Sequence, residues 1–123
     1  FYIHLIRRII CFIAYAMTRH PDLVSGTNRT DLALMQTAPD DWVTKIGADG
    51  VQAIGVKSKG LGIAIRIADG NARALHAVTA EVLQQLGLLD DVANTPLARY
   101  ARPNIVNYRG TITGRVEPLF RLR

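Results

Sequence analysis

The sequence predicts an α+β fold in which an antiparallel sheet of two hairpins is covered by helices. Two runs rich in β-branched residues flank a polar turn at residues 57–60, which is the pattern of a hairpin. Residues 72–86 repeat their apolar side chains at helical spacing. Two further strand-like runs flank the turn Arg109-Gly110. With 123 residues the chain forms one domain at most, and it shows no internal repeat.

Residues 1–18 are predicted to form an amphipathic helix rather than a membrane span. Arg7 and Arg8 interrupt the apolar run and leave nine uninterrupted apolar residues, whereas a span needs about 20. The polar positions recur at helical spacing, and the isoleucines line the opposite side. No small-residue cleavage site of a signal peptide follows, and Pro21 is expected to end the helix.

A second, short helix is predicted after Thr30, which we take as its N-cap, with Asp31 in the first turn. Residues 39–41 then turn the chain into Trp42. The third helix, residues 72–86, should end at Gly87 in the left-handed conformation. His76 lies on its less apolar side and is expected to be a solvated histidine rather than a ligand. The apolar stripe of that helix consists of Leu75, Val78, Val82, Leu83 and Leu86.

The segment from Lys45 to Gly50 is the main candidate for function. Its lysine stands directly before a glycine-rich turn, at the mouth of the predicted sheet, where a side chain can be held in place. Gly47 and Gly50 carry no Cβ, so their backbone N–H groups can approach a ligand closely. A plain surface lysine before a tight turn is the alternative interpretation.

Composition and charge describe an ordinary globular protein. The apolar fraction is 49% and the charged fraction 20%. The single Cys11 excludes an internal disulfide and a cysteine metal cluster, so a reducing cytoplasm is the expected compartment. The net charge of +5 includes arginines dispersed through residues 99–123, without aromatic stacking residues or a helix-turn-helix pattern, so we expect no nucleic-acid partner. A membrane partner is not expected either.

The usual nucleophile motifs are missing. Ser25 and Ser58 are the only serines, and neither begins a Ser-x-x-Lys tetrad. A Gly-x-Ser-x-Gly elbow, a His-Glu-x-x-His zinc motif and a Walker loop are also absent from the sequence. The chain therefore carries no self-contained nucleophile.

Three stretches together resemble the C-terminal part of the bacterial L-asparaginase II family. They are MTRHPDLVSGTNRTDLALM at 17–35, VTKIGADGVQAIGVKSKGLGIAIRIADGNARA at 43–74 and ARPNIVNYRGTITGRVEPLF at 101–120. The resemblance covers about residues 12 to 122. Residues 1–11 fit the pattern poorly and are expected to be a leader. Residues 1–123 are thus interpreted as a single partial domain.

The resemblance implies hydrolysis of L-asparagine to L-aspartate and ammonia by serine-lysine pairs, in a fold similar to serine β-lactamases and glutaminases. Lys45-Ile46-Gly47 looks like the Lys-Thr-Gly element of that fold, so Lys45 is the candidate catalytic lysine. Gly47, Asp49 and Gly50 are the candidate substrate-binding residues. The serine, and any zinc ligands, would belong to an N-terminal half absent from this chain, which itself should need no cofactor. That half, or a second copy, is the expected partner.

Two alternatives to an active hydrolase remain open. The chain is a non-catalytic remnant or an interaction module if the nucleophile is never supplied. For His20, Arg29 and Asp31, which fall where the family is similar, a structural role is favoured over contact with substrate.

Overall fold

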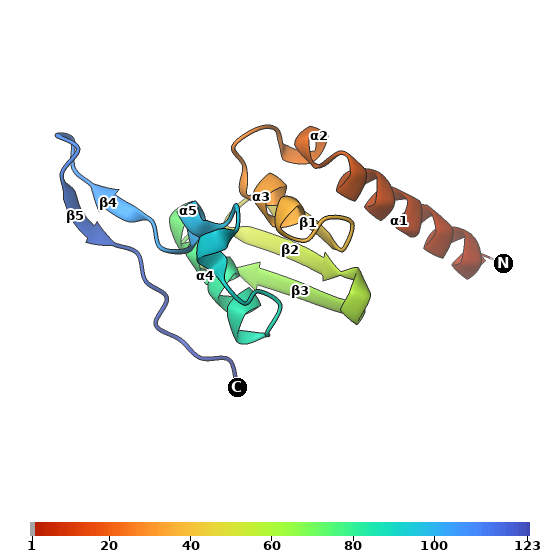
Figure 1. Cartoon of the computed structure of the whole chain (residues 1–123). Helices are drawn as coiled ribbons and strands as arrows, with labels where there is room; N and C mark the ends of the chain where they lie inside the picture. Colours follow the sequence, from red (N-terminus) through yellow and green to blue (C-terminus); the bar gives the residue numbers. More distant parts are fainter. Residues whose placement is uncertain (1) are drawn as a thin grey trace.

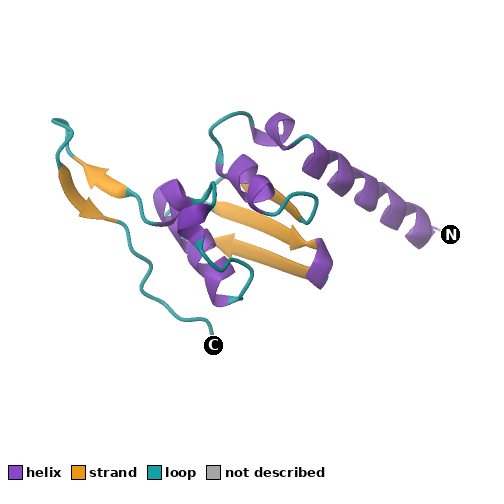
Figure 2. Cartoon of the chain, in the orientation of Figure 1, coloured by secondary structure: helices purple, strands orange, loops and turns teal. Residues whose placement is uncertain are grey.

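The computed structural model describes residues 2–123 and has an α+β architecture, as predicted (Figures 1 and 2). The helices are α1 (Tyr2–Arg19), α2 (Pro21–Ser25), α3 (Thr30–Thr37), α4 (Ala72–Gln85) and α5 (Ala98–Ala101), with short 3₁₀ turns at Lys57–Lys59 and Val92–Asn94. The strands are β1 (Trp42–Gly47), β2 (Val51–Val56), β3 (Leu61–Arg66), β4 (Asn104–Val106) and β5 (Ile112–Arg115).

The main sheet has three antiparallel strands in the order β1-β2-β3. The predicted β2–β3 hairpin is confirmed, with Gln52 opposite Ile65 and Gly55 opposite Gly62. Its turn uses Gly60 in the left-handed conformation, at a φ of 59°. Strand β1, which the two-hairpin prediction did not count, adds an edge strand to this sheet.

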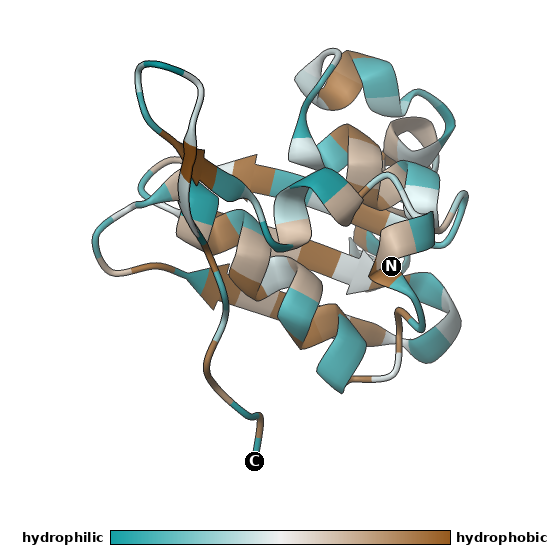
Figure 3. Cartoon of the chain, turned by 60° about the vertical axis from the view of Figure 1, so that its left-hand side comes forward, coloured by the Kyte–Doolittle hydropathy of each residue, from teal (hydrophilic) through white to brown (hydrophobic). Residues whose placement is uncertain are grey.

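The core lies on one face of this sheet. Trp42, Ile54 and Val56 alternate with exposed residues along β1 and β2, so their side chains share a face. Leu34 of α3 and Leu83 of α4 pack against them. Hydropathy colouring shows the hydrophobic strands and the hydrophilic turns around them (Figure 3). The opposite face of the sheet carries few large side chains and is left for the candidate site.

Helix α4 follows its prediction closely. The side chain of Asn71 caps it by accepting hydrogen bonds from the N–H groups of Arg73 and Ala74. Gly87 follows with a φ of +65°. One member of the predicted stripe differs, because Leu86 caps the end of the helix and is 43% exposed. In α3, Thr30 is the first helical residue, and Arg29 occupies the N-cap position without a side-chain hydrogen bond.

Helix α1 extends away from the sheet (Figure 1). It ends at Arg19, and Pro21 begins α2, as the proline predicted. Thr18 is the one buried residue of α1. Among the described residues, no helix is long and apolar enough to cross a membrane.

The second predicted hairpin also forms, as a separate sheet of β4 and β5. Its register shifts between Ile105 and Val106, so that Thr113 has no opposite residue. The predicted irregularity at Gly114 therefore falls on its neighbour. The hairpin and the tail after it form an arm beside the main body (Figure 1).

Candidate functional site

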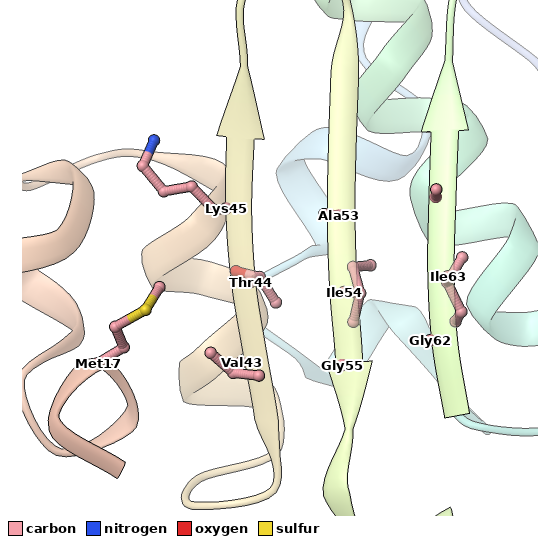
Figure 4. A pocket seen from close by; sticks show the side chains of 10 residues that line it. Met17, Val43, Thr44, Lys45, Ala53, Ile54, Gly55, Gly62 and Ile63 are labelled. Carbon is pink, nitrogen blue, oxygen red and sulfur yellow. The ribbon is translucent and has the colours of Figure 1, made fainter. Parts of the chain in front are cut away.

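Lys45 lies in the middle of edge strand β1, on the face of the sheet opposite the core. Its neighbours Thr44 and Ile46 turn inward, and Lys45 is exposed. Its Nζ donates a hydrogen bond to the carbonyl oxygen of Ile46 at 2.8 Å. Figure 4 shows the side chain reaching outward from β1, on the side where Met17 of α1 also lies.

A shallow groove of about 440 Å³ runs beside Lys45 across the sheet (Figure 4). Its floor is built mainly from alanine and glycine, because Lys45 pairs with Ala53 and Ala53 with Ala64. The full lining is Met17, Val43, Thr44, Lys45, Ala53, Ile54, Gly55, Gly62, Ile63 and Ala64. No bulky side chain fills the floor, so a second surface can approach the backbone here.

The predicted substrate-binding residues lie in the turn that follows Lys45. Gly47 ends β1 and is exposed, and Asp49 is exposed with a φ of 57°. Gly50 is buried instead. A Cβ placed on it would lie 2.9 Å from the Cα of Gly70, and its carbonyl oxygen accepts a hydrogen bond from the N–H of Ile67 at 2.9 Å. Close packing against Gly70 therefore accounts for a glycine at position 50 without a ligand.

A buried carboxylate fixes β1 from behind. Asp31 of α3 is completely buried, and its Oδ2 accepts a hydrogen bond from the Ile46 N–H at 2.9 Å. Its Oδ1 accepts from the Thr44 hydroxyl at 3.1 Å and from the Gln52 amide at 2.9 Å. Three donors from two strands thus converge on one carboxylate, directly beneath Lys45-Ile46-Gly47. The structure gives Asp31 the structural role that the sequence favoured.

His76 is half-buried rather than solvated, which corrects the expectation from its helical position. Its ring lies within hydrogen-bond distance of the Thr30 hydroxyl, at 3.0 Å for Nδ1, and packs edge-on against Tyr100 at 5.3 Å. Burial lowers the pKa of His76, an effect that the Asp31 carboxylate opposes and Arg29 reinforces. These side chains border a small cavity of about 140 Å³ on the core side of β1. Nothing in the period of α4 reveals this pairing, because Thr30 is 46 residues away.

The two serines have other surroundings. Ser58 donates from its hydroxyl to Asp41 Oδ2 at 2.8 Å. Ser25, at the end of α2, is partly buried, and its hydroxyl oxygen has no hydrogen-bond partner among the described residues. Neither serine lines the groove beside Lys45. Within residues 2–123, no group of three or more His, Cys, Asp or Glu side chains could hold a metal ion.

Comparison with known proteins agrees with the pattern of the sequence. The family model of L-asparaginase II matches residues 7–118, so the match begins within the first eleven residues, which were expected to fit poorly. None of the curated proteins compared with the chain matches it. Because the family model covers most of the chain, this protein belongs to the L-asparaginase II family.

Proposed function

We propose that this chain provides the lysine half of an active site that hydrolyses L-asparagine to L-aspartate and ammonia. The observation that carries the proposal is the position of Lys45, exposed on an edge strand at the wall of a groove lined by small residues. A structural lysine has no need of an open floor beside it. A catalytic lysine does, because the substrate and the nucleophile must both reach its amine.

The proposed chemistry is acyl transfer. A serine hydroxyl attacks the side-chain amide carbon, Lys45 takes the hydroxyl proton and returns it to the leaving ammonia, and water then releases aspartate from the acyl-enzyme. A lysine amine accepts protons near neutral pH only where burial or nearby cations favour its neutral form. Covering the groove would supply that burial.

The serine is proposed to come from an N-terminal half that docks over the groove, as are any zinc ligands. The small side chains of Ala53, Gly55 and Ala64 support this, because they allow another element to pack close to the strands. Gly47 and Asp49 stand at the rim, where they are proposed to contact substrate. Gly50 is proposed to act with them indirectly, by holding the turn against Gly70.

For the chain alone we expect no ammonia release from asparagine above the buffer background. Neither serine lines the groove beside Lys45, so the covalent step has no nucleophile there. In isolation the chain then behaves as the non-catalytic module that the sequence left as the alternative.

A chimera tests the proposal. Residues 12–123 of this chain are joined to the N-terminal part of an active L-asparaginase II protein, and ammonia release from asparagine is measured. We expect activity, and a loss of about 10²–10⁴-fold in turnover for Lys45→Ala, the range for a placed proton-transfer group. The matched control is Lys57→Ala, an exposed lysine in the β2–β3 turn, which should leave turnover unchanged.

The control on folding uses the unfused chain. Lys45→Ala should change its free energy of unfolding by at most about 0.5 kcal/mol, because the side chain is exposed. An active chimera that keeps its turnover after Lys45→Ala would show that Lys45 is an ordinary surface lysine. Activity of the unfused chain that is lost on mutating Ser25 or Ser58 would place the site elsewhere.

A further inference from the structure

The surface of α1 points to a partner that the proposed function does not use. The helix runs for 18 residues, yet Thr18, at its last turn, is the only buried one. Its large apolar residues stay in solvent, with Ile3 81%, Ile10 60% and Phe12 70% exposed. This is more exposed apolar side chain than one folded chain ordinarily leaves in a single place.

The exposed residues divide sharply between two sides of the helix. At about 100° per residue, the apolar side chains form one broad face. That face comprises Ile3, Leu5, Ile6, Ile9, Ile10, Phe12, Ile13 and Met17. The narrower polar face contains His4, Cys11 and Tyr15 and is bordered by Arg7 on one side and by Arg8 on the other.

The charge of α1 has one sign. Its sequence contains three arginines and no aspartate or glutamate. Arg19 pairs with Asp40 at 3.7 Å, and Arg7 and Arg8 lie further out along the helix. An apolar face bordered by arginines is the pattern of a helix that lies in the plane of a membrane surface, with the cations at the level of the lipid phosphates.

We propose that α1 binds an anionic lipid surface, with its isoleucine face in the boundary between headgroups and acyl chains. A second copy of the chain fits this face less well. Pairing two apolar faces would bring Arg7 and Arg8 of both copies to the same rim, with no acidic residue on either helix to pair with them. Anionic lipid supplies the missing negative charge on both borders. The expectation that the chain has no membrane partner considered only a spanning segment.

Co-sedimentation with vesicles tests this inference in the full 123-residue chain. Vesicles of phosphatidylcholine mixed with phosphatidylserine should bind the chain, and added salt should weaken the binding. Arg7→Gln with Arg8→Gln should weaken it by about 30-fold, from two cations near an anionic surface. Ile6→Gln with Ile13→Gln should weaken it at least as much, although the charge is unchanged.

The control variant is Leu23→Gln with Leu119→Gln. It removes two exposed leucines outside α1, which are 80% and 93% exposed, and should bind like the parent chain. Circular dichroism checks that every variant keeps its helices. Binding that ignores the isoleucine pair, or that is equal on vesicles of phosphatidylcholine alone, would overturn the proposal.

The single Cys11 allows a measurement of depth. It is exposed on the polar face, so a spin label there should stay at the headgroup level. A label at Ile9→Cys in a Cys11→Ser background should lie deeper and be shielded from a water-soluble relaxation agent. Equal shielding of the two labels, or self-association by sedimentation without vesicle binding, would assign the face to a protein partner. Neither outcome bears on Lys45, so this inference and the proposed function fail separately.

Discussion

At the scale of single residues, the carboxylate of Asp31 does the most to set the geometry of the candidate site. It is completely buried and accepts hydrogen bonds from the Ile46 N–H, the Thr44 hydroxyl and the Gln52 amide. Since the first of these donors lies between Lys45 and Gly47, the direction of the lysine strand depends on an aspartate from a different element. A buried carboxylate tolerates such a position only when its oxygens are hydrogen-bonded in this way.

Asp31→Ala should therefore destabilise the chain by about 3 kcal/mol, because it leaves the Ile46 and Gln52 donors buried without an acceptor. Urea unfolding measures the change as a lower midpoint with an unchanged slope. Asp40→Ala is the control, since Asp40 is exposed and pairs only with the exposed Arg19, and it should shift stability by less than about 1 kcal/mol. Equal midpoints for the two variants would contradict this role of Asp31.

The sequence identified Lys45 and Asp31 as residues of interest, but it could not join them. Lys45 is conspicuous because of the glycines that follow it, which is a local signal. The partners of Asp31 lie 13 to 21 residues further along the chain, on two different strands. The half-buried state of His76 was missed for the same reason, since Thr30 comes from another helix. Helical periodicity reports which face is apolar and says nothing about such distant contacts.

At the scale of elements, the turn between β1 and β2 depends on close contact between two glycines. Gly50 has a φ of +70° and lies against Gly70, at the turn that leads from β3 to α4. The contact joins the mouth of the first hairpin to the start of α4. It thereby fixes the segment that carries Gly47 and Asp49.

Gly50→Ala should destabilise the chain by about 2–4 kcal/mol, from a strained φ and from a Cβ that would lie 2.9 Å from the Gly70 Cα. Gly60→Ala separates the two effects, because Gly60 has a φ of +59° with nothing within 4 Å of its Cβ position. It should cost only about 1 kcal/mol, the strain alone. Thermal or urea unfolding measures both variants. Equal losses would mean that the contact with Gly70 does not matter.

Elements with strong local signals were predicted well. The β2–β3 hairpin was defined by its turn at Gly60, and α4 by its apolar period and by Gly87. Strand β1 was harder to place, because its residues show only a weak alternation and its pairing with β2 depends on the turn at Asp49 and Gly50. Leu86 fell outside the core because it follows the last helical turn, where the period no longer applies.

At the scale of the whole molecule, stability should be concentrated in the three-stranded sheet with α3 and α4. The buried cluster comes from these elements and from the segment between α4 and α5. The arm formed by β4 and β5 contributes no member to it, and both strands are largely exposed. Two bonds tie the tail that follows, at Phe120 and Leu122, to the exposed side chain of Gln85.

Hydrogen exchange should therefore separate the two sheets. Amides of β2, paired on both sides, should exchange only on global unfolding, whereas those of β4 and β5 should exchange through local opening, since an isolated hairpin is marginally stable. Added urea should accelerate exchange in β2 far more than in the arm, because local opening exposes little surface. Exchange of Ile105 and Gly114 as slow as that of Ile54 would show that the arm unfolds with the core. Selective protection of the arm as protein concentration rises would instead mean that it pairs with another copy of the chain.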